Sequence, residues 1–156
     1  ACASAGAEVT HVDSAKAMVE RAGENVRLSG LTDAKVRYII DDCLKFVRRE
    51  IKRGRKYDAI IMDPPSFGRG PNGEMWKIED NLFSLIRETK EVLSDNPLFY
   101  LLNSYTTGLQ PTVMANMLKL GLNTSENAVI TADEIGLNTR EEGIVLPAGA
   151  SALAIF

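Results

Sequence analysis

The sequence is poor in the residues that build metal centres and disulfide frameworks. Among 156 residues there is one histidine, His11, and there are two cysteines, Cys2 and Cys43, far apart and in no CxxC spacing. A structural zinc site needs about four Cys or His ligands, and a disulfide framework needs several cysteines. The sequence therefore predicts neither a metal site nor a disulfide framework.

Long apolar runs and a strong positive charge are also lacking. No apolar stretch approaches the roughly 20 residues that span a bilayer, and Ala1–Gly6 lacks the layout of a signal peptide. We therefore expect no membrane association and a cytoplasmic location. The net charge of −3 argues against a surface built wholly to bind phosphates. Six basic residues do crowd into residues 48–56, where a solvated helix end is the first interpretation and a phosphate-binding patch the alternative.

What is present is the composition of one globular domain and a regular alternation of strands and helices. With 45% hydrophobic and 25% charged residues, we expect a single domain over residues 1–156. Apolar runs predict strands at Glu8–Val12, Val36–Ile40, Tyr57–Met62 and Leu98–Leu102, and spacings of three and four predict helices after them. This alternation predicts a three-layer α/β sandwich with a mostly parallel sheet, and Tyr57–Met62 near its centre, covered on both faces.

The two ends of the chain depart from this alternation. Ala128–Thr131 and Ala150–Phe156 predict an antiparallel pair at the sheet edge, because no helix joins them. Ala1–Ala7 has the pattern of a helix end that leads into Glu8–Val12 with no strand before it. In a doubly wound sheet the first strand is central, and the loop after it opens the cofactor site. We therefore expect an N-terminally truncated domain in which Glu8–Val12 and Tyr57–Met62 have unpaired edges.

Acidic residues follow two consecutive strands. Asp13, which precedes Ser14, can accept hydrogen bonds from both hydroxyls of a ribose. At Asp41–Asp42 a carboxylate can accept from the exocyclic amine of an adenine, while the backbone N–H of Cys43 faces a ring nitrogen. When either position is considered alone, helix capping explains its acidic residue as well as ligand binding does. Two acidic strand ends in consecutive strand–helix units would converge on one crevice, so together they predict an adenosine ligand.

The strongest signal is Asp63–Gly68, which reads Asp-Pro-Pro-Ser-Phe-Gly and follows the expected buried strand. Its two prolines fix φ and donate no backbone hydrogen bond, so the turn is rigid. Such a turn can aim backbone carbonyls and a carboxylate at a planar nucleophile, and Phe67 can stack on a base turned out of its helix. A purely structural turn is the alternative.

Several segments together carry a family resemblance. They are similar to class I S-adenosylmethionine-dependent methyltransferases akin to bacterial large-subunit ribosomal RNA methyltransferases. The similarity covers most of the chain, in the segments His11–Ser14, Glu24–Asn25 with Leu28–Leu31, Ile40–Phe46, Asp63–Phe67, Gly68–Trp76 and Leu98–Leu109. It implies a Rossmann-like fold, S-adenosylmethionine as cofactor, and methylation of RNA, ribosomal RNA first of all.

The resemblance also implies roles for individual residues. Asp13 would hold the ribose of S-adenosylmethionine, and Asp63 would border both the methyl donor and the target base. The expected cofactor-binding residues are Asp13, Ser14, Asp42, Cys43 and Asp63. The expected catalytic residues are Asp63, Pro64, Pro65 and Phe67.

Two departures from the family narrow the expected chemistry. The glycine-rich loop that seats the methionine end of the cofactor is absent and would precede Ala1. Relatives that methylate carbon 5 of cytosine attack the ring with a cysteine, whereas the segment 103–105 reads Asn-Ser-Tyr. Cys43 would lie on the cofactor side, as a small packing residue. We therefore expect methyl transfer to a ring or exocyclic nitrogen by alignment, without a covalent cysteine intermediate.

Other interpretations stay open. Asp13 also permits a NAD-dependent oxidoreductase on a similar sheet, although the Asp-Pro-Pro turn disfavours it. A non-catalytic fragment or binding module is the second alternative. Arg69 and Tyr105 fall in loops on the expected substrate side and could clamp or stack on a polynucleotide. Trp76 is equally interpretable as a base platform or as an anchor for the helix after it.

Overall fold

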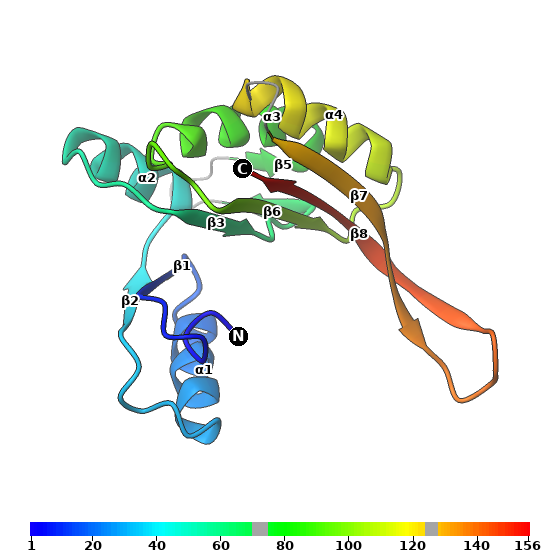
Figure 1. The fold of residues 1–156 in the computed structure, drawn as a ribbon, viewed down its shortest axis with the longest axis horizontal. Helices are drawn as coiled ribbons and strands as arrows, with labels where there is room; N and C mark the ends of the chain where they lie inside the picture. Colours follow the sequence, from blue (N-terminus) through cyan, green and yellow to red (C-terminus); the bar gives the residue numbers. More distant parts are fainter. Residues whose placement is uncertain (70–74, 124–127) are drawn as a thin grey trace. The chain divides into compact units, whose positions relative to one another are not determined.

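The computed structural model describes residues 1–69, 75–123 and 128–156. It consists of two compact units, Ala1–Arg49 and Glu50–Phe156. Each unit has strands and helices of its own (Figure 1). The single domain expected over residues 1–156 stays a prediction.

The unit Ala1–Arg49 is built on a parallel strand pair joined by a helix. Its elements are β1 (Val9–Asp13), α1 (Lys16–Leu28) and β2 (Val36–Ile40). The two strands pair in parallel from Val9↔Val36 to Asp13↔Ile40, as the alternation predicts. α1 stops before Gly30, whose φ of 71° lies in the left-handed region that favours glycine. Residues 1–7, expected to end a helix, form turns instead.

The helix α2 (Cys43–Lys52) runs from the first unit into the second. Its buried positions include Phe46, Val47 and Glu50. Glu50 is only 1% exposed, and both of its carboxylate oxygens have partners: Arg53 Nη1 donates to Oε1 at 2.8 Å and Tyr57 Oη donates to Oε2 at 2.7 Å. These bonds offset the cost of burying the charge.

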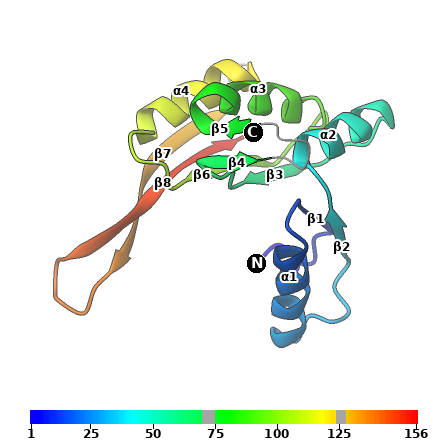
Figure 2. The ribbon, with the colours of Figure 1, turned by 180° about the vertical axis from the view of Figure 1, so that it is seen from behind.

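The unit Glu50–Phe156 contains a four-stranded mixed sheet. Its strands, in spatial order, are β3 (Ala59–Met62), β6 (Phe99–Ser104), β8 (Val145–Ile155) and β7 (Val129–Asn138). β3 and β6 are parallel, whereas β8 is antiparallel to both β6 and β7. The helices α3 (Ile78–Lys90) and α4 (Pro111–Leu122) cover one face of this sheet (Figures 1 and 2). The α/β class and the antiparallel C-terminal pair are therefore confirmed.

The core of this unit lies between β6 and the two helices. Tyr100 and Leu102 of β6 are fully buried, as are Met114 and Leu118 of α4. Because side chains alternate along a strand, every second residue of β6 faces the helices. The Tyr100 hydroxyl is satisfied by Thr89 Oγ1 at 2.6 Å, so this buried polar group is not left unpaired.

The strand β3 differs from expectation in its surroundings. It forms the end of the four-stranded sheet, and Ile61 is 54% exposed. Over the described parts of the chain, the prediction that Tyr57–Met62 is central and covered on both faces is therefore wrong, because β3 pairs with β6 alone and α3 and α4 cover one face of the sheet. Within the described residues, β1 likewise pairs with β2 alone.

A short hairpin follows the proline turn where a loop was expected. It pairs β4 (Phe67–Arg69) with β5 (Met75–Lys77) in antiparallel register, from Phe67↔Lys77 to Arg69↔Met75. Three-residue strands are too short to show a period in the sequence. Residues 70–74 of the segment Gly68–Trp76 lie outside the described residues.

Candidate functional site

Asp13 lies at the carboxyl end of β1, where it shapes the turn into α1. Its Oδ1 accepts a hydrogen bond from the backbone N–H of Ala15 at 2.7 Å. Within the described residues its second carboxylate oxygen has no hydrogen-bond partner. Ser14, which follows, is exposed. The local structural role of Asp13 is thus present, and it leaves one acceptor oxygen for a ligand.

Asp42 has the equivalent place after β2. Its Oδ1 accepts from the backbone N–H of Lys45 at 2.8 Å, which is the geometry of a helix N-cap for α2. The preceding Asp41 is paired with Arg49, whose hydrogen bond lowers the pKa of Asp41. Asp42 therefore also combines a capping bond with a second oxygen that has no partner in the described parts of the chain.

These acidic strand ends lie side by side. The backbone N–H of Asp41 donates to the carbonyl of Asp13 at 3.1 Å, which continues the parallel pairing of β1 with β2 by one residue. Cys43 Sγ lies 3.8 Å from the carbonyl oxygen of Val12. The structure thus brings Asp13, Asp42 and Cys43 together at one edge of the first unit.

The environment of Cys43 suppresses thiolate formation. Desolvation of the thiol, followed by the negative charges of Asp13, Asp42 and Asp41, raises the pKa of Cys43 to about 11. A nucleophilic cysteine needs the opposite, a pKa lowered by nearby positive groups. At neutral pH Cys43 is therefore a neutral side chain.

In the second unit, the turn after β3 is held by hydrogen bonds to its backbone carbonyls. Trp76 Nε1 donates to the carbonyl of Pro65 at 2.6 Å, and the backbone N–H of Ile78 donates to the carbonyl of Ser66 at 3.0 Å. The hairpin β4/β5 and the start of α3 therefore fix the turn. The hydrogen bond makes Trp76 an anchor for the proline turn, while its expected roles as a base platform or as an anchor for the helix after it stay predictions.

A pair of hydroxyl groups links this turn to the loop after β6. Ser66 Oγ and Thr106 Oγ1 are 2.7 Å apart, and Ser104 Oγ accepts from the backbone N–H of Thr106 at 3.2 Å. Neither Ser66 nor Thr106 was predicted as a site residue from the sequence. The sequence could have indicated them, because each is a hydroxyl residue shortly after one of two predicted parallel strands, and the carboxyl ends of neighbouring parallel strands lie at the same edge of a sheet.

The side chains that face solvent at this edge are a carboxylate and two aromatics. Asp63 has no hydrogen-bond partner within the described residues, and partial burial raises its pKa. Phe67 is 55% exposed and Tyr105 is 59% exposed. Pro64 is half-buried, whereas Pro65 and Arg69 are exposed. This arrangement offers a hydrogen-bond acceptor and flat apolar surfaces on a fixed backbone.

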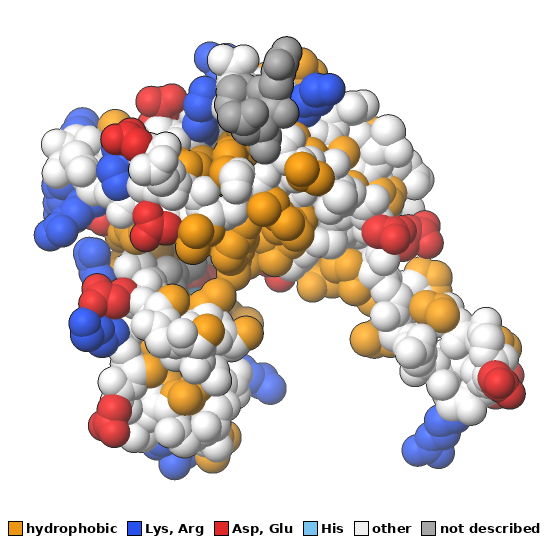
Figure 3. Space-filling view, in the orientation of Figure 1, with side chains coloured by type: hydrophobic (Ala, Val, Ile, Leu, Met, Phe, Trp, Pro, Cys, Tyr) orange, Lys and Arg blue, Asp and Glu red, His pale blue; other side chains and the backbone are white. Residues whose placement is uncertain are grey.

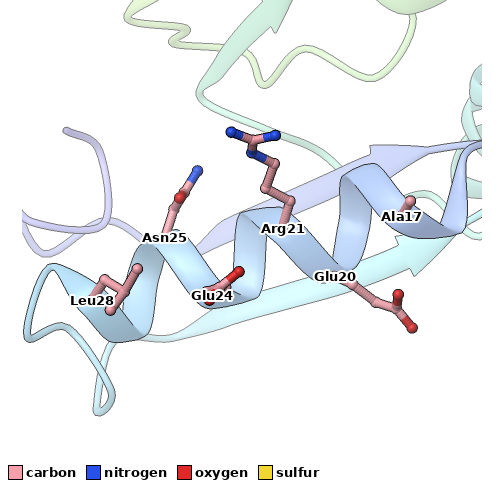
Figure 4. Close-up of a pocket in the computed structure, with 6 residues that line it drawn as sticks. All are labelled: Ala17, Glu20, Arg21, Glu24, Asn25 and Leu28. Atoms are coloured by element: carbon pink, nitrogen blue, oxygen red, sulfur yellow. The ribbon is translucent and has the colours of Figure 1, made fainter.

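Each unit thus contributes one group of predicted residues. Asp13, Ser14, Asp42 and Cys43 belong to Ala1–Arg49, and Asp63 to Phe67 belong to Glu50–Phe156. A separate pocket on the surface of α1 is lined by residues of that helix alone and by none of the predicted ones (Figure 4). It shows no convergence of polar groups from different elements.

Two absences apply to residues 1–69, 75–123 and 128–156. No helix there is both long and apolar enough to cross a bilayer. No group of three or more His, Cys, Asp and Glu side chains there could hold a metal ion.

Comparison with known proteins gives curated relatives for part of the chain. No family model matches it. The ribosomal RNA large subunit methyltransferase I of Erwinia tasmaniensis is 43% identical over 65 residues, and that of Klebsiella pneumoniae is 40% identical over 60 residues. These alignments cover 42% and 38% of the chain, and only 16% and 15% of the relatives' own lengths.

Solved structures match nearly the whole chain. The SAM-dependent methyltransferase from Agrobacterium tumefaciens superposes on 98% of it with a TM-score of 0.89 and 34% identity. A methyltransferase complexed with SAH covers 94% with a TM-score of 0.72, and its 21% identity bears on the fold alone. The chain spans 50% and 38% of these two proteins. Over the length that it shares with them, the chain belongs to the class I S-adenosylmethionine-dependent methyltransferases and has their Rossmann-like fold.

Proposed function

We propose that this chain carries the adenosine-binding and base-binding residues of an S-adenosylmethionine-dependent methyltransferase that acts on a nucleobase of RNA, in the first place ribosomal RNA. A cytoplasmic location and the absence of a covalent cysteine intermediate are parts of the proposal. The observation that carries it is the Asp63 turn, whose backbone is fixed by hydrogen bonds while its carboxylate is unpaired among the described residues.

The cofactor side rests on the two acidic strand ends. Asp13 would accept from the ribose hydroxyls and Asp42 from the adenine amine. Each would use the oxygen that is left over from its local bond, which is a turn bond to Ala15 for Asp13 and a helix-capping bond to Lys45 for Asp42. Ser14 and Cys43 would line the same site. A negative pair of carboxylates suits a ligand rich in hydroxyl and amine donors, and adenosine offers both.

The reaction side rests on Asp63, Pro64, Pro65 and Phe67. S-adenosylmethionine, when bound, supplies a methyl group on a positively charged sulfur. Asp63 would accept a hydrogen bond from the amine of the target base and so orient its lone pair, while the exposed ring of Phe67 would stack on the base. The carbonyl of Pro65 is already used by Trp76, which leaves that of Pro64 as the second acceptor of the turn.

The chain's cysteines support transfer without a covalent intermediate. Attack on carbon 5 of a pyrimidine needs a thiolate beside the base. Position 104, the last residue of β6, is a buried serine. Cys43 has a raised pKa and lies on the expected adenine side. An amine or ring nitrogen needs no such nucleophile, because its own lone pair attacks the methyl group.

The proposal is tested by cofactor titration and by transfer of a tritiated methyl group. We expect the chain to bind S-adenosylmethionine in calorimetry, and not NAD. We expect Asp63→Asn to lower methyl transfer to ribosomal RNA by about 10²-fold with cofactor affinity retained, since the negative charge and one of the two acceptor oxygens are lost.

The matched control is Asp58→Asn, an exposed carboxylate just before β3. It removes the same charge from the other end of the strand, so activity should stay unchanged. Binding of NAD alone, or label in protein and in no RNA, would overturn the proposed function.

A further inference from the structure

Positive charge gathers where α2 ends. Residues 48–56 hold six Lys or Arg side chains and one carboxylate, Glu50, in a chain whose net charge is −3. Figure 3 shows Lys and Arg side chains crowded over this helix. Its helix dipole accounts for some cations at the last turn, but it amounts to only about half a charge. The surplus of positive charge needs another explanation.

Four of these cations, Lys52, Arg53, Arg55 and Lys56, form a basic cluster that is exposed and belongs wholly to the second unit. Arg53 is neutralised by the buried Glu50. Lys56 Nζ donates to the backbone carbonyl of Glu91, which carries no net charge. The side chains of Lys52 and Arg55 make no hydrogen bond or ion pair within the described residues. Three of the four cations are therefore not neutralised by an ion pair there.

Backbone hydrogen bonds hold the segment that carries this basic cluster. Gly54 has a φ of 65°, and the backbone N–H of Arg55 donates to the carbonyl of Glu50 at 3.0 Å, which closes the helix end. The backbone N–H of Tyr57 then donates to the carbonyl of Val92 at 2.8 Å. The basic side chains are therefore attached to a folded turn, so the backbone loses little conformational entropy when they bind an anion.

The basic cluster lies at the opposite end of β3 from the proposed reaction turn. Lys56 precedes the strand and Asp63 follows it. An extended chain rises about 3.3 Å per residue, which places the two roughly 20 Å apart. A ligand that contacts both groups must be long, as a polynucleotide is, and a single nucleotide could not reach.

We propose that Lys52, Arg53, Arg55 and Lys56 form a phosphate-binding patch for the RNA backbone, distinct from the site that receives the target base. The proposal rests on RNA as the substrate of the proposed function. An anionic membrane is the competing partner, but surface-binding helices need an exposed apolar face. In α2 the apolar Phe46 and Val47 are buried.

The test measures binding of a fluorescein-labelled single-stranded RNA of about 20 nucleotides by anisotropy, between about 50 and 200 mM salt. We expect the double variant K52E/R55E to weaken binding at least about 10-fold at the lower salt. We also expect the slope of log affinity against log salt to fall by about 1.4, because each phosphate contact on a single strand contributes about 0.7.

The matched control is K119E/R140E, which changes the net charge equally at exposed positions of the same unit. It should keep the salt slope of the unaltered chain. The proposal is overturned if the unaltered chain binds no RNA, if the two variants weaken binding equally, or if vesicles with anionic lipid are bound in place of RNA. The anisotropy experiment measures RNA binding and does not depend on methyl transfer. The proposed function is tested separately, because it would be contradicted by a tritiated methyl group found only in protein.

Discussion

At the scale of single residues, Asp13 and Asp42 each combine a local structural hydrogen bond with a carboxylate oxygen that is left for a ligand. Asp13 uses one carboxylate oxygen in the turn before α1, Asp42 uses one to cap α2, and the other oxygen of each has no partner within the described residues. Capping and ligand binding, which compete as explanations when only the sequence is considered, are therefore compatible. Asp63 differs because the turn around it is held by backbone carbonyls and by Ser66, which leaves its whole carboxylate unpaired within the described residues.

Cys43 yields a prediction about pH. Because its pKa is raised to about 11, the thiolate fraction at pH 8 is small, and alkylation should accelerate with pH up to about that value. The measurement is the rate of iodoacetamide labelling in a Cys2→Ser background, followed by mass spectrometry. Cys43→Ala should leave cofactor binding within about 2-fold, because the contact expected with the adenine is made by the backbone N–H of Cys43 and its side chain serves for packing.

The control for the labelling is Cys2, followed in the same way in a Cys43→Ala background. A labelling midpoint of Cys43 near or below that of an ordinary thiol would contradict the raised pKa. Loss of methyl transfer in Cys43→Ala, with cofactor binding intact, would reopen the question of a catalytic cysteine.

At the scale of elements, β8 approaches the end of β6 more closely than a side chain allows. Gly149 has a φ of 130°, and a Cβ there would lie 2.5 Å from the carbonyl oxygen of Ser104 and 2.9 Å from Tyr105 Cδ1. The obstacle on one side is backbone, which cannot rotate away. The glycine therefore permits the antiparallel pairing that ends at Ser104↔Ala150, beside the loop that carries Thr106.

We expect Gly149→Ala to lower the free energy of unfolding by about 2 to 5 kcal/mol, from backbone strain and overpacking together. Urea denaturation followed by circular dichroism measures the change. Gly54→Ala is the matched control, since Gly54 also has a positive φ but a Cβ at that position would meet no heavy atom within 4 Å. Its cost should be about 1 kcal/mol. Equal costs for the two variants would rule out the close approach as the cause.

At the scale of the whole molecule, charge and apolar surface are unevenly distributed. The basic residues 48–56 stand out in a chain of net charge −3, and large apolar side chains are exposed in both units, among them Leu28, Ile40 and Ile61. β3 is the end strand of its sheet. An edge strand with exposed backbone groups is a template for pairing with another chain.

We therefore expect the isolated chain to self-associate as its concentration rises. Sedimentation velocity over a concentration series measures this. Ile61→Lys should reduce association, because a charge on an edge strand opposes pairing. Leu120→Lys, at a side chain 71% exposed on α4, is the matched control and should have little effect. A chain that stays monomeric throughout, with one cooperative melt, would contradict this expectation.

Local pattern in the sequence was enough for the order of the longer strands and helices, the antiparallel C-terminal pair and the acidic strand ends, but not for the β4/β5 hairpin. Periodicity and strand-end chemistry act over a few neighbouring residues, so they can be recognised in one dimension. The hydrogen bond from Trp76 to Pro65, the Ser66–Thr106 pair and the approach of Gly149 to Ser104 depended on the tertiary structure. Each joins segments between 11 and 45 residues apart, and only the packing of strands and loops brings such segments into contact. The exposure of Ile61 was decided in the same way, by which face of the sheet the helices cover.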